Sequence, residues 1–284
     1  MSYVELFETV IAGDFTSTDV MAFTATTFFA QFFRFFIACL VPFFIIFRFG
    51  KSFFHKYRMQ EKPVEKARIL YEVKYSLWTM LLFFLTNFLV LYLVKVGYFK
   101  IYTDFSEKGL GYFVLTCFYI VFVHDAFFYW THRLLHTKWL FKKVHYVHHR
   151  NRDTNPITAF CFHPIETLIQ VSAAVVLFGI IPLHPFAILF FNLWWTSMDI
   201  YGHVGHEFFP KFWRKKGVNL WASSAYHNLH HSKVTSNFGL YFTFWDRLMG
   251  TTDFKSYLKV LDRHADKISK DDREEISLDS KAFS

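Results

Sequence analysis

The sequence has few cysteines and few charged residues for its length, and both shortages narrow the class of protein. Its 284 residues include three cysteines, Cys39, Cys117 and Cys161, none of them in a CxxC spacing. Their number and spacing argue against a disulfide framework and a thiolate metal site. Charged residues make up 19% of the chain, against roughly 25% in soluble domains, whereas hydrophobic residues make up 53%. This composition indicates that lipid is the solvent for much of the surface.

Two further features are missing, those of secreted and of nucleic-acid-binding proteins. No basic segment precedes the first apolar run, where Glu5, Glu8 and Asp14 lie instead, so we expect no cleavable signal peptide. The formal net charge of +8 could favour nucleic acid. The basic residues, however, gather in short segments beside apolar runs, which is typical of the cytoplasmic surface of a membrane protein. We therefore expect no nucleic-acid partner.

Long apolar stretches are abundant. Three of them, residues 21–49, 77–99 and 110–130, are each long enough for one transmembrane helix, which needs ~20 residues. A fourth stretch, residues 168–200, is too long for one helix, and a Pro-Leu-His-Pro sequence interrupts it. Prolines spaced in this way mark a turn, so we expect two short helices that form a hairpin, which either dips into the bilayer or crosses it twice.

The charges between the spans predict their orientation. The connection at residues 48–68 carries seven Lys or Arg residues against two Glu, and the connection at residues 100–109 has no such excess. The positive-inside rule then places the first connection in the cytoplasm and the N-terminus outside. The hairpin leaves from the cytoplasmic side and returns to it. We expect a multi-pass protein of the bacterial inner membrane or the endoplasmic reticulum, with its active site on the cytoplasmic face.

The predicted fold class is all-α: an integral membrane helical bundle with a cytoplasmic, histidine-rich helical cap. The membrane domain is expected to cover residues 1–261, with the cap at residues 131–163 and 201–251. Residues 262–284 alternate acidic and basic side chains with little apolar content. Such a segment cannot bury much apolar surface, so we expect a charged, partly disordered tail.

Fifteen histidines are present, and most of them gather in four motifs. The motifs are an HxxxH pair at His132 and His136, an HxxHH triplet at His145, His148 and His149, an HxxH pair at His203 and His206, and a second HxxHH triplet at His227, His230 and His231. Residues three or four apart share one face of an α-helix, with Cβ atoms ~5–6 Å apart. Each triplet therefore aims its first and last histidines at one side. Four such motifs can surround two metal ions that each need roughly four to six ligands.

The alternative for any single histidine is a structural role, in which a hydrogen bond satisfies the ring. Two HxxHH triplets and an HxxxH pair in one chain are hard to obtain by chance, and ionisable residues near the membrane tend to mark function. We therefore predict that the eight histidines of these three motifs carry the chemistry, with His203 and His206 as further metal ligands. Imidazole suits iron, copper, nickel and zinc alike, so the residues alone leave the metal open.

From Trp130 to Thr251 the sequence resembles the fatty acid hydroxylase/sterol desaturase superfamily. The segment from Tyr129 to His136 resembles its first histidine box, with Asp125 four residues before the tyrosine. The two HxxHH triplets resemble its second and third boxes. The run Asn-Phe-Gly-Leu-Tyr-Phe-Thr-Phe-Trp-Asp-Arg at residues 237–247 resembles that of sterol C5-desaturases.

The resemblance implies a non-haem di-iron centre that uses O₂ as co-substrate. The implied reaction is hydroxylation or desaturation at an unactivated C–H bond of a sterol or fatty-acyl lipid. The two iron ions would have ten histidine ligands: His132, His136, His145, His148, His149, His203, His206, His227, His230 and His231. Asp125 and Asp246 would orient ligand imidazoles through their second ring nitrogen. His163, soon after the second triplet, and Glu207, beside His206, are expected to lie next to the metal ligands and to support them.

The expected partners are a lipid substrate from the bilayer and a separate electron donor of the cytochrome b5 or ferredoxin type. The donor is expected to be separate because the His-Pro-Gly-Gly motif of a fused cytochrome b5 does not occur in the sequence. Two alternatives stay open. A membrane metal transporter would place its ligands near the bilayer midplane. A structural zinc-binding membrane protein would lose stability, but no chemistry, when a histidine is removed.

Overall fold

The structure, a computed structural model, describes residues 9, 16–59, 64–209 and 220–282. Across these residues every regular element is a helix, and the β-type contacts are three isolated bridges. The prediction of an all-helical fold is confirmed. Three helical segments, Ser17–Phe49, Lys66–Lys95 and Gly109–Leu135, are long and apolar enough to cross a membrane. The acidic residues used for the signal-peptide prediction lie outside the described residues.

The first apolar run forms one continuous helical segment. Its elements are α2 (Ser17–Phe35), the π-helical η1 (Phe36–Leu40), α3 (Val41–Phe43) and the π-helical η2 (Phe44–Phe49). A capping box begins it, because the Thr16 hydroxyl accepts from the Asp19 N–H and the Asp19 carboxylate accepts from the Thr16 N–H. Phe29 is 67% exposed and Phe49 is 81% exposed, so this segment presents an outward face that suits lipid as its solvent.

The later apolar runs form two long helices and a hairpin. They are α5 (Lys66–Lys95), α6 (Gly109–Leu135), α9 (Pro164–Ile180) and α10 (Pro185–His203). Both hairpin helices begin with a histidine N-cap, His163 or His184, followed by proline at the first helical position. Proline fits there because that position needs no N–H, and the histidine Nδ1 accepts the next free N–H, from Ile165 or Phe186. The fourth apolar stretch is thus divided into two helices at residues 181–184, where its prolines predicted a turn.

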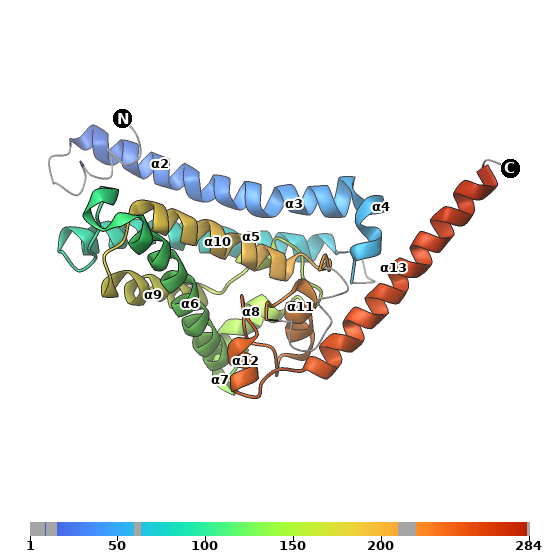
Figure 1. Ribbon diagram of the computed structural model, residues 1–284. Coiled ribbons are helices and arrows are strands. Elements are labelled where there is room, and N and C mark those ends of the chain that lie inside the picture. The colour runs from blue at the N-terminus through green and yellow to red at the C-terminus, as the bar shows by residue number, and fades with distance from the viewer. Residues whose placement is uncertain (1–8, 10–15, 60–63, 210–219, 283–284) are drawn as a thin grey trace.

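Shorter helices fill the connections and the C-terminal third of the chain. They are α4 (Lys51–Phe54), η3 (His55–Tyr57), η4 (Phe105–Glu107), α7 (Lys138–Leu140), η5 (Phe141–His145), α8 (Tyr146–His149), η6 (Thr158–Phe160), α11 (Ser224–Lys233), α12 (Phe244–Leu248) and α13 (Phe254–Ala282). Figure 1 shows α7, α8, α11 and α12 below α10, on the opposite side of the bundle from α2. Direct packing of α11 on α10 joins this part to the long helices.

The two ends of the bundle carry different residues. At one end the hairpin tip meets the connection between α5 and α6, because the Leu183 N–H donates to the Lys100 carbonyl at 2.8 Å and the Tyr102 N–H donates to the Leu183 carbonyl at 3.1 Å. His184 lies at this end, with its Nε2 3.0 Å from the Thr103 carbonyl. The histidine motifs lie at the opposite ends of α6 and α10, so His184 is remote from them.

The second long helix begins at Lys66, well before the predicted residue 77, because its polar first turns find partners inside the protein. Glu72 is fully buried, and its carboxylate accepts from the Asn155 side-chain amide at 2.8 Å and from the Thr158 hydroxyl at 2.5 Å. These bonds offset the cost of burying a polar side chain. They also fasten the segment that follows the second histidine triplet onto α5.

The C-terminal segment is helical, contrary to the prediction of a partly disordered tail. One helix, α13, continues to Ala282, and Figure 1 shows it leading away from the bundle. Tyr257, Leu261 and Ala265 are buried at four-residue spacing, which forms an apolar stripe along one face. This stripe packs against α11 and its neighbours. The alternating charges of residues 262–269 therefore belong to an amphipathic helix.

Replacing Glu72 with alanine tests whether this residue holds the segment after the second histidine triplet, which includes Asn155 and Thr158, against α5. The substitution leaves the buried Asn155 amide and Thr158 hydroxyl without their acceptor, so we expect a loss of about 2–5 kcal/mol in the free energy of unfolding. Thermal unfolding of the purified chain in detergent measures the loss, with Lys74→Ala as control because Lys74 is exposed on the same helix. Equal unfolding temperatures for the two variants would contradict this role of Glu72.

Candidate metal centre

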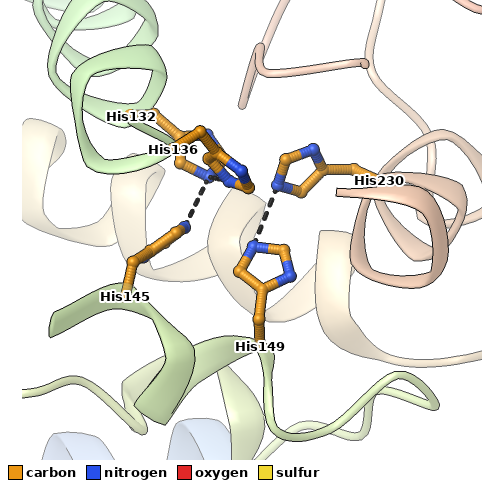
Figure 2. A group of neighbouring side chains, drawn as sticks. All are labelled: His132, His136, His145, His149 and His230. Carbon is orange, nitrogen blue, oxygen red and sulfur yellow. Dashed lines mark hydrogen bonds between the residues drawn. The ribbon is translucent and has the colours of Figure 1, made fainter. Parts of the chain in front are cut away.

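Nine of the ten histidines predicted as ligands form two groups at one end of the bundle. Group 1 consists of His132, His136, His145, His149 and His230, and group 2 consists of His148, His203, His227 and His231. Within each group, one ring nitrogen from every member lies within 4.8 Å of all the others. Figure 2 shows the five rings of group 1 turned toward one another. All nine side chains are buried except that of His136, which is half-buried.

The two HxxHH triplets contribute to the groups in opposite ways. The triplet of η5 and α8 gives its first and last histidines to group 1 and its middle one to group 2. The triplet of α11 gives its first and last histidines to group 2 and its middle one to group 1. Helical spacing produces this result, because residues four apart point to one side and the residue between them points elsewhere. The predicted pairing of first and last members is confirmed.

Hydrogen bonds to backbone carbonyls fix the tautomer of four of these rings. The acceptors of the Nδ1–H groups are the Phe238 carbonyl for His132 (2.8 Å), the Asp199 carbonyl for His203 (2.7 Å), the Ser236 carbonyl for His230 (2.7 Å) and the Asn151 carbonyl for His231 (3.0 Å). A carbonyl oxygen only accepts, so the proton is on Nδ1. The Nε2 atom of each ring is then left with a lone pair.

These lone pairs meet one another, and this is the strongest indication of a bound cation. The Nε2 atoms of His203 and His231 are 3.2 Å apart, yet both rings carry their proton on Nδ1, so no hydrogen lies between them. The Nε2 atoms of His203 and His227 are 2.9 Å apart, and those of His230 and His149 are 3.1 Å apart. Ligands about 2.1 Å from one metal ion lie about 3.0–3.4 Å from each other at octahedral to tetrahedral angles. The donor set therefore fits a nitrogen-ligated metal ion in each group.

Burial keeps the rings in the form that binds metal. Burial and the neighbouring imidazoles lower the pKa values of His145, His149 and His230 well below the ordinary histidine value. The same two causes lower the pKa values of His227 and His231. These imidazoles are neutral at pH 7, and the neutral ring is the metal ligand.

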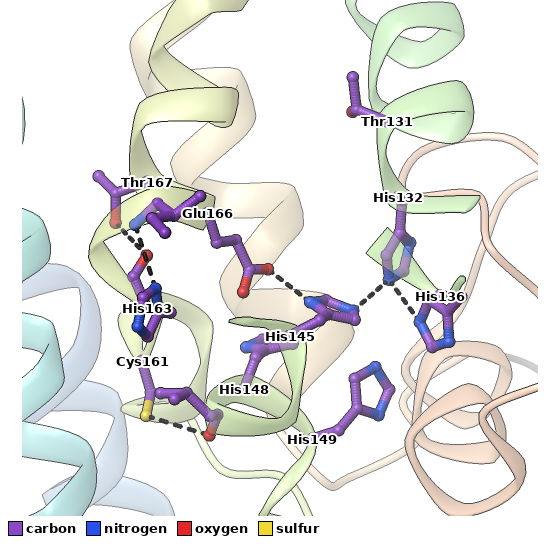
Figure 3. A network of polar contacts seen from close by, with 12 residues as sticks. Thr131, His132, His136, His145, His148, His149, Cys161, His163, Glu166 and Thr167 are labelled. Carbon is purple, nitrogen blue, oxygen red and sulfur yellow. Dashed lines mark hydrogen bonds and ion pairs between the residues drawn. The ribbon is translucent and has the colours of Figure 1, made fainter. Parts of the chain in front are cut away.

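Two buried carboxylates that the sequence analysis missed contact the ligand rings. Glu166, near the start of α9, accepts from the His145 Nδ1–H at 2.7 Å. Figure 3 shows this contact and the onward approach of His145 to His132. Asp199 lies one helical turn before His203 on α10, with its carboxylate 3.2 Å from the His203 Nδ1. The i, i+4 spacing of Asp199 and His203 was a signal that the sequence offered.

The predicted supporting residue His163 lies outside both groups. It caps the N-terminus of α9 through its Nδ1, as Figure 3 also shows. It thus begins the helix whose first turn carries Glu166. Its contribution to the groups is indirect and passes through that carboxylate.

The prediction that Asp125 and Asp246 orient imidazoles directly is wrong. Asp125 accepts from the backbone N–H groups of Tyr241 and Phe242 at 3.1 and 3.3 Å. Asp246 accepts from the N–H groups of Phe238 and Gly239 at 2.9 and 2.8 Å. Both carboxylates therefore hold the backbone of the 237–247 run. The Phe238 carbonyl of that run in turn accepts from His132, so Asp246 positions the His132 ring indirectly, through the backbone of Phe238.

Glu207 organises the helix that carries the third box. Its carboxylate accepts from the Ser223 hydroxyl at 2.6 Å and from the Ala225 N–H at 3.0 Å, at the N-terminus of α11. A negative charge is favourable there because the first N–H groups of a helix are unpaired. No imidazole of either group is among the hydrogen-bond partners found for this carboxylate in the described part of the chain.

His206, the tenth predicted ligand, is not brought to either group. Its Nδ1–H donates to the Val204 carbonyl at 3.0 Å, and its ring packs edge-on against Phe47 with 5.1 Å between centroids. Burial, together with the nearby charge of Arg58, lowers its pKa to about 4. The structure gives it a place between the end of the first helical segment and α10.

A contact chain from α5 reaches group 2. The Arg68 guanidinium donates to the Asn151 side chain, and to the Asp153 carbonyl at 3.0 Å. The backbone carbonyl of Asn151 accepts from the His231 Nδ1–H. Arg68 and Glu72, one turn apart on α5, thus both hold the segment after the second triplet in place.

Comparison with known proteins gives the family. The family model for fatty acid hydroxylase matches residues 117–251. The lathosterol oxidase of Homo sapiens is 33% identical over 57% of this chain and 54% of its own length. A Delta(7)-sterol 5(6)-desaturase of Gibberella zeae is 31% identical over 55% of this chain and 47% of its own. A very-long-chain aldehyde decarbonylase of Oryza sativa subsp. indica is 31% identical over 85% of this chain and 89% of its own. No solved structure matches the chain.

These matches show that the chain belongs to the fatty acid hydroxylase/sterol desaturase superfamily. Within it, the resemblance to sterol C5-desaturases is confirmed by the lathosterol oxidase and sterol desaturase relatives. The chain spans about half the length of the lathosterol oxidases that it matches. The three long apolar helices and these relatives together indicate a membrane protein.

A pair of substitutions tests the division into groups. His148→Ala removes one of four ligands from group 2, so we expect bound metal to fall from about two ions per chain to about one. His206→Ala removes a ring outside both groups and should leave about two. Elemental analysis of the purified variants measures both values. Equal metal loss in the two variants would restore His206 as a ligand.

A second pair tests the carboxylate of Glu166. Glu166→Ala frees the His145 ring to turn, so we expect group 1 to bind its metal ~10–100-fold more weakly. Glu166→Gln keeps an oxygen acceptor and should recover most of the affinity. Gln170→Ala is the control, because Gln170 lies one turn further along α9 and its carboxamide oxygen has no hydrogen-bond partner among the described residues. Competition with a chelator measures the affinities, and equal values for Glu166→Ala and the control would refute the role.

Proposed function

We propose that this chain is a membrane-bound, O₂-dependent lipid oxidoreductase with two iron ions, one in each histidine group. The substrate is a sterol or fatty-acyl lipid drawn from the bilayer, and the reaction is hydroxylation or desaturation of an unactivated C–H bond. The convergence of nine imidazoles on two small volumes supports this proposal most strongly. The family match and the sterol-acting relatives support the choice of iron and of a lipid.

Bound iron would supply, with O₂, the oxidising power to remove hydrogen from a saturated carbon. The residues of this chain hold the site in order and keep water away. The Phe128 ring lies 4.9 Å from that of His132, and the Phe162 ring lies 4.9 Å from that of His148. Each group therefore has an apolar ring against its histidines. Trp195, from α10, packs against both Phe83 and His124 and extends this aromatic surface toward the long helices.

We place the site on the cytoplasmic face. The basic connection after the first helical segment lies at the same end as the groups, because the Met59 N–H donates to the Gly205 carbonyl at 3.1 Å, directly after α10. The positive-inside rule assigns that connection to the cytoplasm. A separate cytochrome b5 or ferredoxin would then reach the site from the cytoplasm.

The position of the groups also bears on the alternatives. They lie at the ends of α6 and α10, whereas a transporter needs its ligands near the middle of the spans. A structural zinc site typically has four ligands and often includes thiolates, whereas the three cysteines are free and belong to neither group. Both observations favour an enzyme.

Lipid mass spectrometry tests the proposal. Cells would express the wild-type chain, His148→Ala or the control His206→Ala at matched protein levels, with ¹⁸O₂ supplied. We expect a lipid in the wild-type and control cells that the His148→Ala cells lack, because only that variant loses a ligand of group 2. Labelled oxygen in this lipid would identify a hydroxylase, and the loss of two hydrogens without label would identify a desaturase. Identical lipids in all three, with iron bound and a donor present, would refute the proposal.

A further inference from the structure

The helical stretch of residues 138–149 has two faces of opposite character. Val144, His145, His148 and His149 are buried, and the three histidines among them point into the groups. The other face is exposed and carries three lysines and two aromatic rings: Lys138, Trp139, Lys142, Lys143 and Tyr146. We call these five residues the basic surface. Their spacing of three or four residues places them side by side along the helix.

The charge of this region has one sign. Residues 126–152 contain six Lys or Arg residues and no Asp or Glu. Trp139 is 67% exposed and Tyr146 is 54% exposed, so the lysines surround apolar rings. Aromatic residues are enriched at protein interfaces, and the rim around them is polar. A positive surface suits a transient encounter with an acidic partner, because complementary charge raises the association rate more than it tightens the final complex.

The basic surface lies close to group 1. It begins two residues after His136, the one half-buried histidine of the nine. Phe141, between the lysines, packs against the His136 ring with 5.3 Å between centroids. The helix that separates the basic surface from group 1 is about 10 Å across with its side chains. Figure 1 shows α7 at the edge of the molecule, at the end of α6.

We propose that the basic surface docks an acidic one-electron carrier protein, which delivers electrons to the metal held by group 1. This inference rests on the proposed function and adds the place and the charge of its partner. Hydroxylation of a C–H bond by O₂ consumes two electrons and two protons, because the second oxygen atom leaves as water. Two encounters with a one-electron carrier therefore supply one turnover, and each encounter oxidises the carrier by one electron.

The test uses the full chain, loaded with iron, in nanodiscs of uncharged phosphatidylcholine. The probe is the soluble haem domain of a cytochrome b5. The test variant combines Lys138→Glu, Lys142→Glu and Lys143→Glu. The control variant combines Lys51→Glu, Lys255→Glu and Lys259→Glu, three exposed lysines on α4 and α13. Both variants change the net charge equally, so they separate a local effect from a global one.

Binding of the probe is measured by titration, and its oxidation by stopped-flow mixing, each at several salt concentrations. For the test variant we expect the Kd and the second-order rate to worsen about tenfold or more at low salt and to lose their salt dependence. For the control variant we expect changes of less than about twofold. Trp139→Ala should weaken binding without altering the salt dependence, because it removes apolar contact and no charge.

Three results would overturn the inference. The test variant could bind and oxidise the probe as the wild type does. Both triple variants could lose binding equally, which would reduce the effect to net charge. The test variant could bind the probe normally yet insert poorly into nanodiscs, which would assign the lysines to the bilayer surface. Dithionite, a small reductant that needs no docking, should reduce the iron in all variants, and a wild-type chain that dithionite cannot reduce would overturn the proposed function itself.

Discussion

The arrangement of the helices depends on holding the Nε2 lone pairs of buried imidazoles against one another at about 3 Å. Such contacts repel unless a cation lies between them, so the surrounding protein must fix each ring from behind. It does so mainly with backbone carbonyls, which accept from His132, His203, His230 and His231. A carbonyl is a reliable anchor because it cannot donate, and it therefore leaves the ring one tautomer.

A backbone carbonyl can hold an imidazole in place only if the loop that carries the carbonyl is itself held in place. The loop at Phe238 is held by Asp246, the segment at Asn151 is held by Arg68, and the N-terminus of α11 is held by Glu207. The hydrogen bonds found for these three charged side chains in the described residues go to backbone groups and to non-histidine side chains, not to the ligand rings. Asp246 and Glu207 are buried and Arg68 is partly buried, and their hydrogen bonds offset the cost of removing these charges from water. The family signature at residues 237–247 thus contains residues that act on the histidines through the backbone.

The sequence predicted the histidines well and their supports poorly, for physical reasons. Helical spacing decides which members of a triplet share a side, so His145 with His149 and His227 with His231 could be paired in advance. The partner of an imidazole, in contrast, depends on how distant segments pack. Glu166 follows the second triplet by a loop and a cap, and no local pattern relates it to His145. The start of α5 was also predicted too late, because the polar residues before residue 77 argued against a buried helix. Glu72, one of them, is buried with hydrogen-bond partners 83 and 86 residues away.

The two triplets divide their histidines between the two groups in opposite ways, and this links two helices that are far apart in the sequence. His149 and His230 belong to one group although 81 residues separate them, and His148 and His231 are joined in the same way in the other. Metal ions held there would connect α8 to α11 twice, and would form two cross-links across the chain between these helices. A chain whose three cysteines are all free has no covalent cross-link of its own. Metal loading would then remove the conformational freedom of that part of the chain much as a disulfide does, and would link maturation of the cofactor to completion of folding.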